Sequence, residues 1–240
     1  MGADRSRPRL AGFALNRDDG LTLALLERGR QLDGPGGPLR IPELDVSRER
    51  GLAWESCAVV GNAASLRKGQ RGAEIDGHSA VIRFNRAPTR GHERQVGAKT
   101  TLRFTNPERE GTLRTGGPFC EGRELVLTKG LKSLRKPTAC RVLPLSPQFV
   151  AYGKYLWGLH PRRRAGAALR SKMSTGFYGL AFALHVCKRV TVYGFRSNGS
   201  HYYRTPRTMG IQSWRARHQW DTERACLQRL AELPNVDHVS

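Results

Sequence analysis

The sequence of 240 residues contains no long hydrophobic run. A helix that crosses a membrane needs about 20 consecutive apolar residues, and the apolar stretch LTLALLERGRQL near the N-terminus is too short. The first ten residues, MGADRSRPRL, also lack the apolar segment of a signal peptide. We therefore expect no anchor or secretion signal within this sequence. An anchor that precedes it in a longer protein is the open alternative.

Acidic residues and lysines are scarce. The chain has 20 Asp and Glu against 41 Lys and Arg, a net charge of +21, and only 8 of the basic residues are lysine. Such a charge favours anionic partners, with nucleic acid as the first candidate. However, the arginines are dispersed, and no basic helix or tail with interleaved aromatics is present. We therefore expect anionic ligands but no nucleic acid; arginines on solvated faces are the simpler explanation of the charge.

Patterns that bind metal ions are absent from the sequence. Its five cysteines form no C-x-x-C pair and have no spacing to histidine that suits zinc. No D-x-D pair is present either, so the usual ligands of a metal-bound nucleotide sugar are missing. We expect no metal cofactor. Widely spaced cysteines are compatible with buried thiols or with one or two long-range disulfides.

The composition divides the chain into two parts. Residues 1–53 are rich in Arg, Gly and Pro, with a short amphipathic helix expected near 21–32 and a break at 33–42 (DGPGGPLRIP). We interpret this part as a stem or extension. Residues 54–240 are long enough for one domain with its own core.

Strand and helix patterns alternate from residue 57 onward. Apolar runs predict strands at 57–61, 80–85, 100–106, 124–129, 140–146 and 189–195. Helices are predicted at 174–187 and 217–233, the second with an apolar stripe of Cys226, Leu227, Leu230 and Leu233. This alternation predicts an α/β fold: a single Rossmann-like, doubly wound, mostly parallel sheet flanked by helices.

Polar residues follow several of these predicted elements. Asn62 comes directly after the first strand and Asn85 after the second, where ligands of parallel sheets bind. Taken singly, each asparagine is equally typical of a turn. Ser174, Thr175 and Gly176 open the apolar helix, and exposed amides at a helix N-terminus bind anions. An ordinary helix cap explains the same residues.

Two histidines lie in polar segments. His201 belongs to the loop sequence GSHYYR, and His218 stands five residues before Glu223 in RHQWDTE. In such arginine-rich surroundings a histidine is more often solvated than catalytic. Neither segment identifies a reaction alone.

Four segments together, in this order, resemble the motifs of one family, the eukaryotic sialyltransferases, which use CMP-sialic acid as donor. Residues 57–104, CAVVGNAASL to TTLRF, resemble the large motif, and residues 174–195, STGFYGLAFALHVCKRVTVYGF, resemble the small motif. HYYR at 201–204 resembles the third motif, and the His218 to Glu223 spacing resembles the very small motif. A chance match would have to satisfy all four. The resemblance implies the GT-A-like sialyltransferase variant of the predicted fold.

The resemblance also assigns roles to the matching residues. Asn62 and Asn85 would hold the CMP portion of the donor, and Ser174, Thr175 and Gly176 would bind its cytidine and ribose. His201 would donate to the phosphate and assist departure of CMP. His218 would be the general base, with Glu223 in support. Transfer to a hydroxyl of a glycan, a galactoside or sialoside, would proceed with inversion and without a metal.

The resemblance further implies a disulfide between Cys57 and Cys187 and a location in the Golgi lumen. Cys120 with Cys140 is a candidate second pair, and Cys226 is expected to be a buried thiol. Two alternatives stay open: a protein of this family that binds CMP or glycan without activity, and a transferase of another CMP-activated acid such as Kdo. The turn Ala63, Ala64 and Ser65, where members usually carry a further Asn or Gly, slightly favours the inactive alternative. The matching His201, His218 and Glu223 favour the enzyme.

Overall fold

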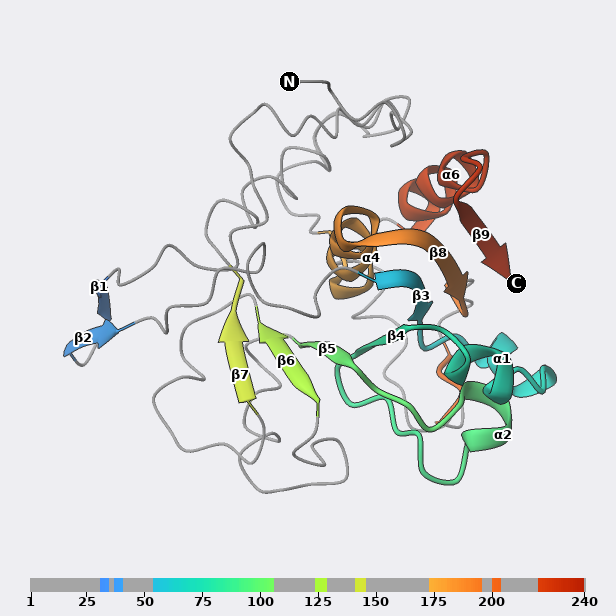
Figure 1. Cartoon of the computed structure of the whole chain (residues 1–240), viewed down its shortest axis with the longest axis horizontal. Coiled ribbons are helices and arrows are strands. Elements are labelled where there is room, and N and C mark those ends of the chain that lie inside the picture. The colour runs from blue at the N-terminus through green and yellow to red at the C-terminus, as the bar shows by residue number, and fades with distance from the viewer. Residues whose placement is uncertain are drawn as a thin grey trace.

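A seven-stranded parallel sheet forms the centre of the computed structural model, which describes residues 31–34, 37–40, 54–105, 124–128, 141–145, 173–195, 200–203 and 220–239. Its strand order is β7-β6-β5-β4-β3-β8-β9, and every neighbouring pair is parallel (Figure 1). The strands are β3 (Trp54–Val60), β4 (Ala80–Phe84), β5 (Leu102–Thr105), β6 (Leu125–Thr128), β7 (Arg141–Pro144), β8 (Cys187–Tyr193) and β9 (Val236–Val239). The predicted parallel α/β sheet is therefore confirmed, whereas β9 was not predicted.

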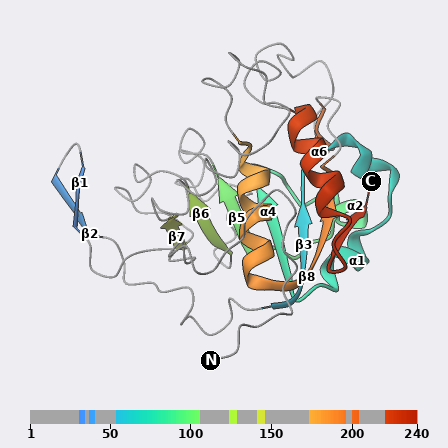
Figure 2. The ribbon, with the colours of Figure 1, turned by 90° about the horizontal axis from the view of Figure 1, so that it is seen from above.

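Helices cover both faces of this sheet. They are η2 (Ala64–Lys68), α1 (Gly72–Asp76), α2 (Glu93–Val96), α4 (Thr175–Val186) and α6 (Trp220–Leu230). Side chains alternate between the faces of a strand, so Cys57 and Val59 of β3 pack with α4 and α6, while Ala58 and Val60 pack with η2, α1 and α2. Figure 2 shows α4 and α6 lying along the same face of the sheet. The fold is doubly wound, as the sequence predicted.

The sequence of each long helix explains its position. α4 is apolar nearly all round, and Phe182 and Ala183 are fully buried where the helix crosses the sheet. α6 is amphipathic, and its predicted stripe is confirmed, with Cys226, Leu227 and Leu230 buried and Leu233 packed against the core. No helix in the described ranges is both long and apolar enough to span a bilayer.

The N-terminal part contains a small antiparallel hairpin of its own. β1 (Gln31–Gly34) pairs with β2 (Gly37–Arg40). The helix predicted near 21–32 is therefore wrong for residues 31 and 32, and the predicted break at 33–42 contains paired strands. Backbone pairing of β1 with β2 outweighs the local helical pattern of residues 31 and 32. Residues 21–30 lie outside the described residues, and the domain boundary at residue 53 stays a prediction.

Candidate active site

The strand order reverses between β3 and β8, and the loops after these two strands meet there. From β3 the sheet grows through β4 to β7 on one side and through β8 to β9 on the other. The Gly61 amide donates to the Tyr193 carbonyl (2.7 Å), and the Ala63 amide donates to the Gly194 carbonyl (3.0 Å). Ligands of open parallel sheets bind beyond the carboxyl ends of the strands at such a reversal.

Asn62 occupies the centre of the turn after β3, here called the large-motif turn (Gly61–Ser65). Its side-chain Oδ1 is buried and has no hydrogen-bond partner among the described residues. An unpaired buried oxygen destabilises a protein by about 1–3 kcal/mol unless a ligand or water satisfies it. The Gly61, Ala63 and Ala64 amides of the turn already donate to protein carbonyls. The Ser65 Oγ of the same turn is likewise buried without a hydrogen-bond partner among the described residues. The side chains of Asn62 and Ser65 are therefore the polar groups of this turn that are suited to contact a ligand.

The third-motif segment (Ser200–Tyr203) lies directly against this turn. His201 forms an antiparallel bridge with Ala63, and the Ala64 amide donates to the Ser200 carbonyl (3.1 Å). The His201 ring stacks on Tyr203 with centroids 5.1 Å apart. The structure thus brings together His201 and Asn62, two predicted site residues that are far apart in the sequence.

Asn85 lies at the same edge of the sheet, at the end of the neighbouring strand β4. Its φ angle of 51° is left-handed, a conformation that asparagine adopts more readily than most residues. The Asn85 amide donates to the Phe104 carbonyl (2.7 Å), and the Asn85 carbonyl accepts from Arg103 (3.0 Å). Arg103 is itself held by a buried ion pair with Glu124 at 2.6 Å. The backbone that presents Asn85 is therefore fixed by two residues of the neighbouring strand β5.

A second set of contacts fixes the start of α4. The Ser174 hydroxyl oxygen accepts from the Phe177 amide (3.1 Å), so Ser174 is the helix cap. Its amide and hydroxyl both donate to the carboxylate of Glu223, at 2.8 and 2.9 Å. Glu223, on α6, is buried. Because the Ser174 amide and hydroxyl already bond Glu223, we expect Thr175 and Gly176 to make most of the contacts from this turn to the CMP-sugar donor. These contacts stay predictions.

Phe195 joins the start of α4 to the turn after β3. A Cβ added at Gly176 would lie 3.2 Å from Phe195 Cε1, and one added at Gly61 would lie 2.8 Å from Phe195 Cδ2. The ring also meets Phe84 edge-on at 5.9 Å. The large and small motifs therefore converge on one aromatic side chain. Sequence reasoning missed Phe195, although its place directly after β8 was a usable signal.

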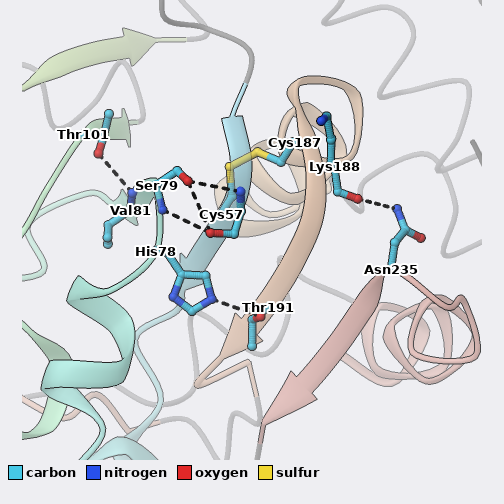
Figure 3. The surroundings of a disulfide bond; sticks show 10 residues. Cys57, His78, Ser79, Val81, Thr101, Cys187, Lys188, Thr191 and Asn235 are labelled. Carbon is cyan, nitrogen blue, oxygen red and sulfur yellow. Dashed lines mark hydrogen bonds between the residues drawn. A yellow bond between two sulfur atoms is a disulfide. The ribbon is translucent and has the colours of Figure 1, made fainter.

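The disulfide implied by the resemblance is confirmed. Cys57 of β3 and Cys187 at the start of β8 are bridged, with Cα atoms 6.0 Å apart and a sequence separation of 130 (Figure 3). Cys226 is a free, buried thiol, as expected. Cys120 and Cys140 lie outside the described residues, so their pairing stays a prediction.

One predicted catalytic residue, His218, also lies outside the described residues. Its motif partner Glu223 is described, and its carboxylate is bound to the start of α4. Within the described part of the chain, no group of three His, Cys, Asp or Glu side chains could hold a metal ion.

The turn after β8 contains Gly194, and substitution of this glycine tests how tightly the turn packs against η2. Gly194 has a left-handed φ of 64°, and an added Cβ would lie 2.5 Å from Leu66 Cδ1. Gly91 has a similar φ of 81° with nothing within 4 Å of such a Cβ. We expect Gly91→Ala to cost about 1 kcal/mol for the backbone alone, and Gly194→Ala to cost about 1–3 kcal/mol more from crowding. Urea unfolding of both variants measures the difference, and equal losses would contradict a tight fit.

Comparison with known proteins agrees with this geometry. The sequence profile of glycosyltransferase family 29 (sialyltransferase) matches residues 38–117 and 118–233. The chain belongs to this family. The fold resembles "Crystal Structure of a Mammalian Sialyltransferase" with a TM-score of 0.58 at 23% identity, covering 94% of this chain and 86% of that one.

Curated relatives are similar over most of this chain. A chicken (Gallus gallus) CMP-N-acetylneuraminate-beta-galactosamide-alpha-2,3-sialyltransferase 1 is 34% identical over 80% of this chain and 60% of the relative. The mouse (Mus musculus) alpha-2,3-sialyltransferase 2 is 33% identical over 75% of this chain and 55% of the relative. The chain thus spans little more than half the length of these relatives.

Proposed function

We propose that residues 54–240 form the catalytic domain of a sialyltransferase, which transfers sialic acid from CMP-sialic acid to a hydroxyl of a galactoside. The main support for this proposal is that Asn62 and His201 lie close together where the strand order of the sheet reverses. The chain also belongs to the sialyltransferase family. Relatives are named as beta-galactosamide and beta-galactoside sialyltransferases, which favours a galactoside over a sialoside as acceptor.

The proposed reaction is a single displacement at the anomeric carbon. The acceptor oxygen forms a bond to this carbon as the bond to the CMP phosphate breaks, which inverts the configuration. His218 takes the proton of the acceptor hydroxyl, a task that suits an imidazole near its ordinary pKa of about 6.5. His201 donates to the leaving phosphate, and an asparagine side chain can donate to it through its Nδ2 amide group. Such donors stabilise the phosphate without a metal ion. The Oδ1 of Asn62, unpaired among the described residues, would instead accept from a hydroxyl or amino group of the CMP-sugar donor.

The base assignment predicts a specific loss. We expect His218→Ala to lower the transfer rate by at least about 100-fold, the usual contribution of general base catalysis. The general base acts on the acceptor hydroxyl and is not needed to bind CMP. The affinity for CMP should therefore stay within about threefold of the wild-type value. Steady-state kinetics and calorimetric titration with CMP measure the two quantities. Equal loss of rate and of CMP affinity would contradict the assignment.

The reaction itself is tested by CMP release from CMP-sialic acid, with and without a panel of galactoside acceptors. Release that depends on one acceptor supports the proposal. CMP binding without turnover for any acceptor would instead favour the inactive alternative, for which the Ala63, Ala64 and Ser65 turn is the specific observation. Competition between CMP-sialic acid and CMP-Kdo identifies the donor.

We further propose that the domain works in the Golgi lumen, with residues 1–53 as part of a stem. The Cys57–Cys187 disulfide supports this location, because such bonds persist in oxidising compartments. The partners would then be the CMP-sugar donor and a glycan acceptor, with no nucleic acid involved. Imaging of the epitope-tagged, full-length protein against Golgi markers tests the location, and a cytosolic signal would contradict it.

A further inference from the structure

Arg67, on η2, is an exposed arginine whose guanidinium lies against the third-motif segment. Its Nε donates to the Tyr202 carbonyl at 2.6 Å, and its Nη2 donates to the His201 carbonyl at 2.9 Å. The two acceptors are consecutive carbonyls of one short piece of chain. One side chain of the large motif therefore holds the two peptide groups on either side of the Tyr202 Cα, and the first of these groups contains the His201 carbonyl.

Other contacts hold the same segment from the opposite direction. The Tyr202 amide donates to the Asn62 carbonyl (3.0 Å), and the buried Tyr202 hydroxyl donates to the Pro88 carbonyl (2.5 Å). The Tyr202 ring also packs edge-on against His92 at 5.1 Å. Tyr202 thus anchors the segment, while Arg67 bonds the carbonyl of His201 itself.

The chemistry of arginine suits this arrangement. A guanidinium presents several N–H donors in a rigid plane and can bond two acceptors at once, whereas a lysine ammonium is a compact donor on a flexible stem. Hydrogen bonds from a charged donor are also stronger than neutral ones. Lysine at this position could hold one carbonyl well but could not fix the orientation of both.

We propose that Arg67 is a positioning residue for His201. It keeps the His201 imidazole beside the turn that carries Asn62, so that both side chains meet the same CMP-sugar donor. This inference rests on the proposed function, because it assumes that His201 acts on the leaving CMP. Arg67 itself need not touch the donor.

Transfer kinetics of Arg67→Met test the role, with Lys68→Met as the matched control. Lys68 is the neighbouring exposed cation, so its loss removes the same charge without touching the His201 backbone. We expect Arg67→Met to lower kcat by about 10–100-fold, since misplacement of a catalytic group by about 1 Å has an effect of this size. The KM for CMP-sialic acid should stay within about threefold. Arg67→Lys should fall between Arg67→Met and the wild type.

The control separates positioning from attraction of the anionic donor. Lys68→Met should match the wild type in both kcat and KM. If Arg67→Met and Lys68→Met both raise KM, and salt weakens the effect, Arg67 attracts the donor by charge and the inference is wrong. Full rescue by Arg67→Lys would also overturn it, because one donor would then suffice.

Amide hydrogen exchange provides a readout that does not need activity. The Tyr202 and Ala64 amides bond across the junction of the two motifs, and we expect Arg67→Met to speed their exchange by about tenfold. Exchange of the Ala58 amide, in the core strand β3, should not change. Unchanged exchange at Tyr202 and Ala64 would overturn the inference, and so would equal acceleration at Ala58, which would indicate general destabilisation. A wild-type protein that transfers no sialic acid would contradict the proposed function, while the exchange result would still decide whether Arg67 holds the segment.

Discussion

Glu223→Ala is expected to destabilise the protein by about 2–4 kcal/mol, because it leaves two buried donors of Ser174 without their charged acceptor. The same change should loosen the first turn of α4, where Thr175 and Gly176 are predicted to contact the donor. We therefore expect CMP to bind at least about tenfold more weakly, since the ligand must then order a turn that Glu223 now holds in place. Urea unfolding measures the stability, and calorimetric titration with CMP measures the affinity.

Two further variants make this prediction sharper. Glu223→Gln keeps one side-chain oxygen acceptor with nearly the same shape, so we expect it to lose about half as much stability as Glu223→Ala. Glu232→Ala removes an exposed carboxylate just after α6 and should change the stability by less than about 0.5 kcal/mol. If Glu223→Ala behaved like Glu232→Ala, the contact between α6 and α4 would contribute nothing to the site.

Removal of the Cys57–Cys187 disulfide is the second change with a large expected effect. The bridge closes a loop over a sequence separation of 130, for which the chain-entropy account predicts about 4–5 kcal/mol of stabilisation. Most small domains are stable by only about 5–15 kcal/mol in total. The double variant Cys57→Ala, Cys187→Ala should therefore unfold at a much lower urea concentration than the wild type.

The disulfide prediction has its own controls. Mass spectrometry of the unreduced protein should find the peptides that contain Cys57 and Cys187 linked to each other. A thiol reductant should lower the unfolding midpoint of the wild type by more than that of the double variant, in which only the candidate Cys120–Cys140 pair is left to reduce. A wild type that unfolds at the same urea concentration as the double variant would show that the bridge adds no stability.

The sequence predicted the sheet well because its strands are short apolar runs with clear periodicity. β9 was missed since only Val236 is buried in a four-residue strand that otherwise looks like a polar tail. The N-terminal strand pair was missed for a related reason: Leu32 takes part in a helical pattern, but its backbone pairs with that of Leu39. Local pattern alone cannot reveal a pairing partner.

The positions of the candidate site residues could be predicted from the sequence, but their hydrogen-bond partners could not. Asn62, Asn85 and His201 were identified from motif positions, and the structure places them at the carboxyl edge of the sheet or beside it. The engagement of Ser174 by Glu223 was not predictable, because a serine before a helix indicates a cap and says nothing of a distant carboxylate. Arg67 was equally hidden, since it is one of many arginines in a strongly basic chain.

The buried thiol of Cys226 has a consequence for how the chain acquires its correct disulfide. Burial raises the Cys226 pKa to about 12, which disfavours the thiolate that attacks a disulfide. We therefore expect Cys226 of the folded protein to react slowly with the Cys57–Cys187 bond. Exchange among these three cysteines would then occur before α6 packs on the sheet, so that packing of this helix suppresses later disulfide exchange.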